Sequence, residues 1–356
     1  MVDVESSPPQ DIRKVGINPE FWYPLARASE LQRGQVIGAS FAGNPIALAR
    51  TGSGRVFALE DRCAHRQVPL HAGVVTGEHI QCGYHAWTYD ATGRCITVPY
   101  LDRSRCQLNG VRAYPCREAY GLIFVFPGLG DSNITAFPDL PSYRSPHYRT
   151  RYLDRSIACH YTFMHENLMD MNHQFLHRRL MGRIQGRLLA HRSSAESVEA
   201  DYTFTRDAGR RSLGERFMIE RRRAPASGHA HNLMTIATAY PYQTLRYWPA
   251  STTEPALDLW NVYVPIDAEQ RHNRTFGLMM IRRPGIPGLI HLLWPFIVRF
   301  TDGIFAEDRW IVEQEQCAFD RQGRDENQEI SPVILALRAL LVNSGIETTQ
   351  NASREA

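Results

Sequence analysis

The chain has 356 residues, of which 43% are hydrophobic, a length that allows two domains, or three, around sizeable cores. Its 40 basic and 37 acidic side chains leave a net charge of +3, so composition gives no reason to expect a nucleic-acid partner. The densest basic cluster, at residues 220–225, is interpreted as a solvated loop. Seven cysteines in a chain of this size, without a signal-like N-terminus, favour a reduced, cytoplasmic setting.

The first third of the chain predicts a small antiparallel β domain. Residues 1–20 are polar and acidic and are expected to form a mobile tail. Over residues 21–128, short alternating runs are bounded by Gly, Asp or Asn, as is typical of strands, and "DATGR" at 90–94 predicts a turn. Residues 129–148 are rich in Pro, Gly and Ser and are interpreted as a linker.

The rest of the chain predicts an α+β unit over residues 149–343. A stretch at 165–182 has no Pro or Gly before its last residue and predicts a helix. Strand-like runs follow, and helical spacing returns over 302–320 and 331–345. Sheet and helices are therefore segregated along the unit. Residues 344–356 are expected to be a polar, frayed tail.

Two mixed Cys-His pairs carry the first chemical signal. Cys63 and His65 are separated by one residue, sixteen residues follow, and Cys82 and His85 are separated by two. Thiolates and imidazoles are soft metal ligands, but a common zinc finger pairs Cys with Cys and then His with His. The mixed order suits a Rieske [2Fe–2S] cluster, in which one iron takes two thiolates and the other two imidazoles. The alternatives are a zinc knuckle or a chance assembly of core side chains.

The neighbours of these pairs fit a cluster site. Gly83 is expected to let backbone N–H groups approach the sulfurs, which tunes a reduction potential. Trp87 is expected to pack beside the second loop, and Pro99 to end the following strand. His71 and His79 lie off the pair positions and are interpreted as loop or surface residues.

A second set of candidate ligands lies in "ENLMDMNHQFLH". On a regular helix, Asn167, Asp170, His173 and His177 fall within an arc of roughly 120°. The two histidines are four positions apart, so both rings can bind one ion. Two histidines and one carboxylate that leave open positions are the ligand set of non-haem Fe(II) oxygenases.

The sequence resembles the Rieske non-haem iron oxygenases over nearly its whole length. The resemblance rests on "WYPLARASEL" at 22–31, on the Cys-His pairs and on the stretch at 166–177. It implies an α+β protein with a small antiparallel Rieske domain and a helix-grip, START-like catalytic domain with a curved antiparallel sheet and flanking helices. It also implies a Rieske [2Fe–2S] cluster and a mononuclear Fe(II) ion.

The third iron ligand is implied only by the resemblance. A carboxylate on a late helix corresponds to Asp308 in "AEDRWIVEQEQ". Glu307 is the nearest rival, with Asp302 and Glu313 behind it. The alternative is that this helix has a solvated acidic face and no ligand.

One departure from the family concerns the histidine spacing. Family members commonly place four residues between the two ligands, whereas His173 and His177 are separated by three. A regular helix accommodates the shorter spacing, so His177 is retained as the expected ligand. His165 and His191 are the other candidates.

The resemblance also implies roles for two polar residues. Asp170 corresponds to an aspartate that joins an iron-bound histidine to a Rieske histidine of a neighbouring subunit, which implies a head-to-tail ring, usually a trimer. Asn167 corresponds to a nearby amide. The alternative is that Asn167 and Asp170 are simply a helix cap and a turn residue.

Together these features predict an oxygenase that uses O₂ and electrons from a ferredoxin or flavin reductase to oxidise an apolar or aromatic small molecule. Hydroxylation, demethylation and desaturation all remain open. The rival hypotheses are a Rieske electron carrier without oxygenase activity and a zinc-stabilised binding module. The apolar segment at 286–298 is too short for a membrane span and is expected to be a lid over the substrate pocket or a patch that touches membrane or lipid-like substrates.

Overall fold

The computed structural model describes residues 11–99, 101, 110–129, 134–208, 232–250 and 252–347. Within it the chain divides into two compact units, described separately below. The smaller comprises Asn18–Asp139 and Val264–Gln270, and the larger comprises Met1–Ile17, Leu140–Tyr263 and Arg271–Ala356. The basic cluster at 220–225 lies outside the described residues.

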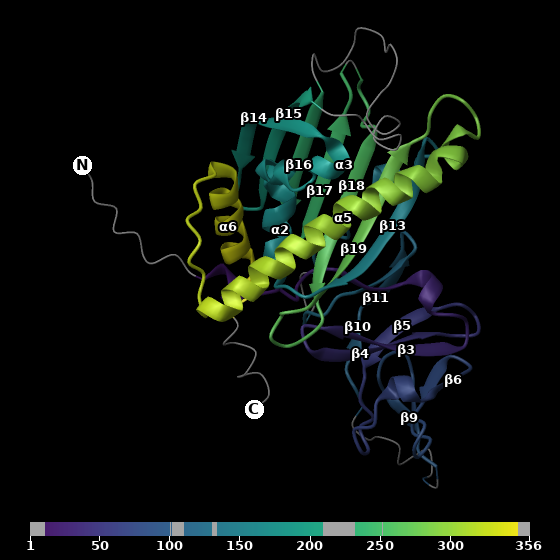
Figure 1. Cartoon of the computed structure of the whole chain (residues 1–356). Helices are drawn as coiled ribbons and strands as arrows, with labels where there is room; N and C mark the ends of the chain where they lie inside the picture. Colours follow the sequence, from purple (N-terminus) through teal and green to yellow (C-terminus); the bar gives the residue numbers. More distant parts are fainter. Residues whose placement is uncertain are drawn as a thin grey trace. The chain divides into compact units, whose positions relative to one another are not determined.

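Three small antiparallel sheets build the smaller unit (Figure 1). Their strand orders are β10-β5-β4-β3, β11-β12-β2 and β6-β7-β8-β9. The strands are β2 Tyr23–Arg27, β3 Gln35–Phe41, β4 Asn44–Arg50, β5 Val56–Glu60, β6 Val74–Thr76, β7 His79–Gln81, β8 Thr88–Tyr89, β9 Cys95–Thr97, β10 Ala113–Tyr114, β11 Cys116–Ala119 and β12 Leu122–Val125, with short 3₁₀ turns η2 Ala28–Glu30 and η3 Leu70–Ala72. The turn expected at 90–94 joins β8 to β9, where the Asp90 carboxylate accepts the backbone N–H groups of Thr92 and Arg94.

A seven-stranded sheet forms the centre of the larger unit, and the expected α+β class is confirmed. Its order is β13-β19-β18-β17-β16-β15-β14. The strands are β13 Tyr148–Ile157, β14 Arg183–Ser193, β15 Ser197–Ala208, β16 Leu233–Ala239, β17 Tyr242–Trp248, β18 Leu257–Pro265 and β19 Asn273–Arg282. The helices are α1 Pro141–Arg144, α2 Tyr161–Met169, α3 Arg178–Met181, α5 Leu289–Gln322 and α6 Pro332–Ser344, with the 3₁₀ turns η1 Ile12–Lys14 and η5 Met171–Phe175.

Residues 11–17 and 346–347, which were predicted to belong to mobile tails, form ordered elements. Two short strands, β1 Val15–Gly16 and β20 Ile346–Glu347, pair with each other. Ile12, Val15 and Ile17 are buried, because apolar side chains at the end of a polar stretch pack into the larger unit. The prediction of mobile tails is therefore wrong for residues 11–17 and 346–347.

The single helix predicted at 165–182 is wrong. It is divided into α2, η5 and α3, and the break falls at Asp170, whose backbone is extended, with φ −85° and ψ 99°. The Asp170 carboxylate accepts the N–H of Asn172 at 2.8 Å, so it caps the next turn instead of continuing the first. Gly182, at φ 72°, then ends α3.

The longest helix, α5, runs diagonally over the sheet (Figure 1). It extends well beyond the apolar segment 286–298, and one 18-residue stretch of it is long and apolar enough to cross a bilayer by length and composition alone. Its packing is that of a helix inside a folded unit, because Arg151 of β13 donates to the Val298 carbonyl and pairs with Asp302. Gly303 is also close to α3, where an added Cβ would lie 2.8 Å from Leu180.

Candidate metal centres

Two loops of matching conformation present the Cys-His pairs. In the first, the Cys63 N–H donates to Val68 and the Cys63 carbonyl accepts from Gln67. In the second, the Cys82 N–H donates to Trp87 and the Cys82 carbonyl accepts from Ala86. Gln67 and Ala86 are both in the left-handed region, at φ 58° and 56°. The local backbone therefore repeats the same hydrogen-bonded turn at each pair, although the two pairs differ in spacing.

These loops bring the four predicted cluster ligands together in pairs. The thiols of Cys63 and Cys82 are both buried, and Cys63 lies close enough to contribute to the raised pKa of Cys82. The rings of His65 and His85 have centroids 4.6 Å apart. Two adjacent thiols and two adjacent imidazoles are the donor set of a Rieske cluster, so these residues fit that group.

Several donors face the sulfurs. Burial raises the pKa of the Cys82 thiol, and the nearby backbone N–H groups of Tyr84 and His85 oppose this rise. Gly83 has a reason to lack a side chain, since an added Cβ would lie 2.7 Å from the Ala72 carbonyl oxygen. On the other side, the hydroxyl of Tyr89 lies 3.2 Å from the Cys63 sulfur.

Tyr89 was not predicted from sequence. Burial raises the pKa of its hydroxyl, and the Ala64 N–H donates to the Tyr89 oxygen at 3.0 Å. Tyr89 therefore keeps its proton and can donate it to the sulfur. Its position seven residues after Cys82, on the strand leaving the second loop, was the available signal.

The remaining residues near the pairs have structural roles. Trp87 stacks on His65, with ring centroids 4.9 Å apart and an interplanar angle of 4°. His71 is an exposed residue of the short 3₁₀ turn η3. Its backbone N–H and its ring Nδ1 are hydrogen-bonded to the buried carboxylate of Asp61. His79 begins β7 and is half-buried.

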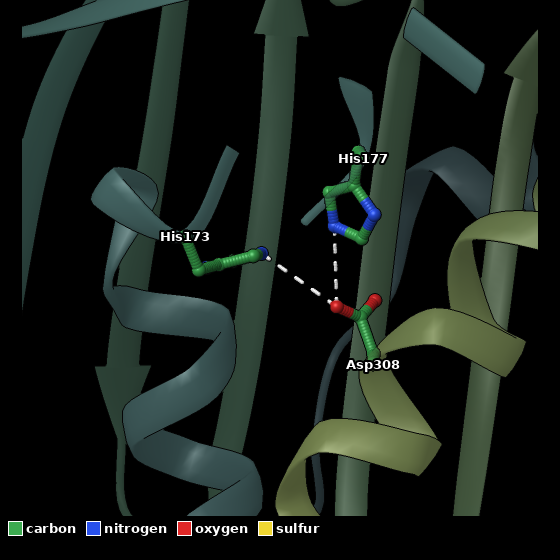
Figure 2. A group of neighbouring side chains, drawn as sticks. All are labelled: His173, His177 and Asp308. Atoms are coloured by element: carbon green, nitrogen blue, oxygen red, sulfur yellow. Dashed lines mark ion pairs between the residues drawn. The ribbon is translucent and has the colours of Figure 1, made fainter. Parts of the chain in front are cut away.

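The second centre combines two histidines and one carboxylate in the larger unit (Figure 2). The ligand atoms of His173, His177 and Asp308 lie within 4.8 Å of one another. Asp308 Oδ1 is 3.6 Å from His173 Nε2 and 3.2 Å from His177 Nε2. This oxygen is buried and, within the described ranges, has no hydrogen-bond partner. A buried carboxylate oxygen that faces two imidazole nitrogens fits a divalent metal ion held by two His and one Asp.

Both imidazoles are oriented from behind. His173 Nδ1 donates to the backbone carbonyl of Asp170, and His177 Nδ1 donates to Glu307 Oε2 at 2.8 Å. These bonds leave both Nε2 atoms free for a metal ion, which is how outer carboxylates and carbonyls usually fix ligand histidines. Burial lowers the pKa of His177, but the nearby carboxylates of Asp308 and Glu307 outweigh this effect, and the net pKa is raised.

The rival carboxylates have other partners. Glu307 orients His177. Asp302 pairs with Arg151 and Arg155. Glu313 pairs with Arg309 at 2.8 Å. Among the acids proposed from sequence, Asp308 is therefore the one that faces both histidines.

The alternative histidines lie elsewhere. His165 is buried against the ring of Tyr263, and burial lowers its pKa to about 3. His191 is an exposed residue of β14. The loss of a regular helix after Met169 does not prevent His173 and His177 from converging, because η5 and the turn that follows place their rings 5.1 Å apart.

Asp170 and Asn167 lie beside the three candidate metal ligands. Asp170 caps η5 with its carboxylate and orients His173 with its carbonyl, so the capping alternative describes Asp170 but not Asn167, which lies within α2. Capping uses one carboxylate oxygen, Oδ1, and leaves the other for a further partner. Asn167, on α2, lines the cavity described next.

A cavity of about 260 Å³ opens beside the three ligands. Its walls are largely apolar and come from the sheet, α2, η5, α3 and α5: Leu168, Met171, Met181, Ile184, Phe204, Met234, Leu245, Leu257, Leu259, Met279, Phe300, Ile304 and Phe305. The polar wall residues include Asn167, Gln174 and Tyr247. No residue of 286–298 lines this cavity, so the lid expected from that segment is not seen in the described part of the chain.

Comparisons with known proteins agree on both centres. The family model of the Rieske [2Fe-2S] domain matches residues 21–115. The family model of the vanillate O-demethylase oxygenase C-terminal domain matches residues 157–341. The 4beta-methylsterol monooxygenase of Methylococcus capsulatus is 30% identical over 350 residues, which cover 93% of this chain and 89% of the relative. The oxygenase component of dicamba O-demethylase from Stenotrophomonas maltophilia is 36% identical over 161 residues, 44% of this chain and 47% of that one.

Solved structures show the same fold. Dicamba monooxygenase bound to dicamba superposes with a TM-score of 0.70 at 22% identity, over 96% of this chain and 99% of that one. NdmA of Pseudomonas putida with caffeine gives a TM-score of 0.67 at 20% identity, over 91% and 88%.

Proposed function

Because the chain belongs to the Rieske non-haem iron oxygenases, we propose that it hydroxylates or oxidatively demethylates an apolar small molecule, with electrons supplied by a ferredoxin or flavin reductase. The observation that carries this proposal is the buried Asp308 oxygen that faces two imidazoles at the wall of an apolar cavity. When bound, the cluster supplies single electrons and the mononuclear iron activates O₂.

The chain's own residues position and shield the reaction. His173, His177 and Asp308 would hold the iron. Three protein ligands leave the remaining coordination positions of the iron open. The bonds from Asp170 and Glu307 fix the ring orientations. The apolar cavity walls exclude water and hold the substrate beside the ligands.

We assign the electron path to Asp170 and a neighbouring subunit. Its backbone carbonyl already holds His173, and its half-buried carboxylate has an oxygen beyond the one that caps η5. That oxygen can accept a bond from a Rieske histidine of a second copy, His65 or His85. Such a head-to-tail contact closes into a ring, and we propose a homotrimer in the cytoplasm.

The cavity indicates the substrate class. Its walls suit a mostly apolar molecule, and its polar contacts are few. The Gln174 carboxamide oxygen is buried without a hydrogen-bond partner among the described residues, so we assign Gln174 to a polar substituent of the substrate. The names of two relatives, a methylsterol monooxygenase and a dicamba O-demethylase, support an apolar skeleton with a small polar group.

Anaerobic reconstitution, followed by a substrate screen that couples O₂ uptake to product, tests the proposed reaction. About three irons per chain are expected, two in the cluster and one at the second centre; two irons and no coupled O₂ uptake would instead indicate an electron carrier, and a colourless zinc protein would indicate a binding module.

Asp170→Asn tests the electron path. This variant should keep both metals and nearly abolish turnover, whereas the control Asp302→Asn should keep both metals and turn over, because Asp302 pairs with Arg151 and Arg155 and not with His173 or His177. Normal turnover by Asp170→Asn would remove the assigned relay.

A further inference from the structure

We propose that the N-terminal part of α5 binds the surface of an anionic lipid bilayer. Two large apolar side chains are exposed there, Leu292 at 71% and Phe296 at 48%, and Ile286, at 64%, is exposed in the segment that leads into the helix. Leu292 and Phe296 are four positions apart and therefore share one helix face. These three residues form what is called the α5 patch below.

The α5 patch is not simply the outside of a core helix. The opposite face of the same segment already supplies the core, because Ile290, Leu293 and Ile297 are buried. The segment is thus apolar on two faces, and only one is covered by the folded unit. Soluble proteins seldom leave contiguous large apolar side chains exposed without a partner, so the patch indicates a binding surface.

The surroundings of the α5 patch are cationic. Residues 283–301 contain Arg283 and Arg299 and no Asp or Glu. Arg149 of β13 lies over the ring of Trp294 at 3.9 Å and contacts His291 at 2.9 Å. Burial and the nearby charge of Arg283 lower the pKa of Arg149, which places these two arginines close together.

These three arginines lack neutralising partners. None of Arg149, Arg283 and Arg299 forms a salt bridge with an acidic side chain in the part of the chain that the structure describes, although Arg283 donates to the Tyr148 carbonyl. By contrast, neighbouring Arg151 and Arg282 pair with Asp302 and Glu254. Positive charge has therefore been left uncompensated at the rim of the patch.

The combination of chemistry favours lipid over an acidic protein. Leucine, isoleucine and phenylalanine side chains can enter the acyl boundary, while flanking arginines contact anionic headgroups and a tryptophan lies at the interface. An acidic electron donor would meet the arginines but would have to cover the exposed apolar side chains as well. A bilayer satisfies both features of the surface at once.

The location of the patch matters for the proposed function. The helix continues directly from Phe296 into Phe300, Ile304 and Phe305, which line the cavity. Binding of α5 to a bilayer therefore brings the cavity near a store of apolar molecules. This consequence rests on the proposed oxygenase function, whereas the membrane binding itself does not.

Vesicle sedimentation of the holoenzyme tests the proposal. Wild type should sediment with vesicles of phosphatidylcholine and phosphatidylglycerol at 3:1, less with pure phosphatidylcholine, and less as salt is raised. Leu292→Ser with Phe296→Ser should weaken binding at least tenfold. The matched control, Ile330→Ser with Leu335→Ser, removes two similarly exposed apolar side chains elsewhere and should bind like wild type.

Two further variants separate the parts of the surface. Arg283→Gln with Arg299→Gln should lower binding to the anionic vesicles by tenfold or more, at about fivefold per arginine, and should leave binding to pure phosphatidylcholine unchanged. Leu292→Trp should tighten binding, and it tests the patch even if the double serine variant does not fold. Cluster absorbance and turnover of a soluble substrate without vesicles show whether each variant is intact.

Three results would overturn the proposal: wild type that does not sediment with anionic vesicles, a double serine variant that binds as wild type does, and a patch that binds an acidic electron donor protein but no vesicles. Because sedimentation needs no turnover, a failure of the proposed reaction and a failure of membrane binding are observed separately.

Discussion

Replacing Glu307 with glutamine tests whether this residue orients a ligand or is itself a ligand. Glu307 Oε2 accepts the Nδ1–H of His177 at 2.8 Å, while Asp308 faces both Nε2 atoms. Glutamine keeps the length of the side chain and an acceptor oxygen but removes the charge that supports the imidazole. Loss of such an outer partner typically costs 10–100-fold in metal affinity, or about 1.4–2.7 kcal/mol. Glu307→Gln should therefore weaken iron binding by this factor, and Asp308→Ala should abolish it.

The assay is an anaerobic titration with ferrous ion, in which the iron bound beyond the two cluster irons is measured against cluster absorbance. Glu313→Gln is the matched control on the same helix, because Glu313 pairs with Arg309 and should not affect the titration. If Glu307→Gln lost the iron as completely as Asp308→Ala, then Glu307 would be a ligand. If it bound iron as tightly as wild type, the bond to His177 would have no part in metal binding.

Three other changes have defined outcomes. Tyr89→Phe removes a hydroxyl 3.2 Å from the Cys63 sulfur and should lower the cluster potential, measured by redox titration, by roughly 20–60 mV, the equivalent of one hydrogen bond; an unchanged potential would contradict this. Burial raises the pKa of Glu315 from its ordinary value of 4.5 to about 7; the charges of Glu166 and Asp170 add to this rise, and nearby arginines oppose it. Between these two pH values the folded state therefore keeps a proton that the unfolded state loses. Folding stability should therefore fall as pH rises from 4.5 through 7, and Glu315→Gln should gain up to roughly 3 kcal/mol over wild type at pH 8 relative to pH 4.5 in denaturant titrations; a gain that is the same at both pH values would refute the assignment. Gln174→Leu should raise KM for the true substrate more than it lowers kcat, whereas a loss confined to kcat would argue against a binding role.

The small unit was the more predictable part of the fold. Short alternating runs bounded by turn residues specify strands locally, and the Asp90 turn needs only contacts within its own five residues. The pairing of β1 with β20 could not be foreseen in this way, because it joins residues more than 300 positions apart. Both strands also lie beside polar stretches of the sequence. Periodicity carries no information about such long-range pairings.

The candidate ligands of the second centre were predictable for different reasons. The two histidines could be proposed from spacing, but Asp308 rested on resemblance, because an acidic helix face offers several carboxylates of equal merit. The structure separates them by their partners: arginines neutralise Asp302 and Glu313, an imidazole Nδ1 binds Glu307, and Asp308 keeps a buried oxygen without a hydrogen bond among the described residues. That distinction depends on tertiary contacts between β13, η5 and α5, which no window of sequence contains.

The short spacing between the histidines is resolved by the break in the helix. In a regular helix through 165–182, the Asp170 carbonyl would accept a backbone N–H of the next turn. It would then not be available to orient the ring of His173. Because Asp170 is extended and caps η5, its carbonyl is instead available to the Nδ1 of His173, and its carboxylate accepts the N–H of Asn172. The residue that interrupts the predicted element is thus the one that fixes a ligand imidazole. The local failure of helix periodicity is a consequence of building the metal site there, as expected where function overrides local propensity.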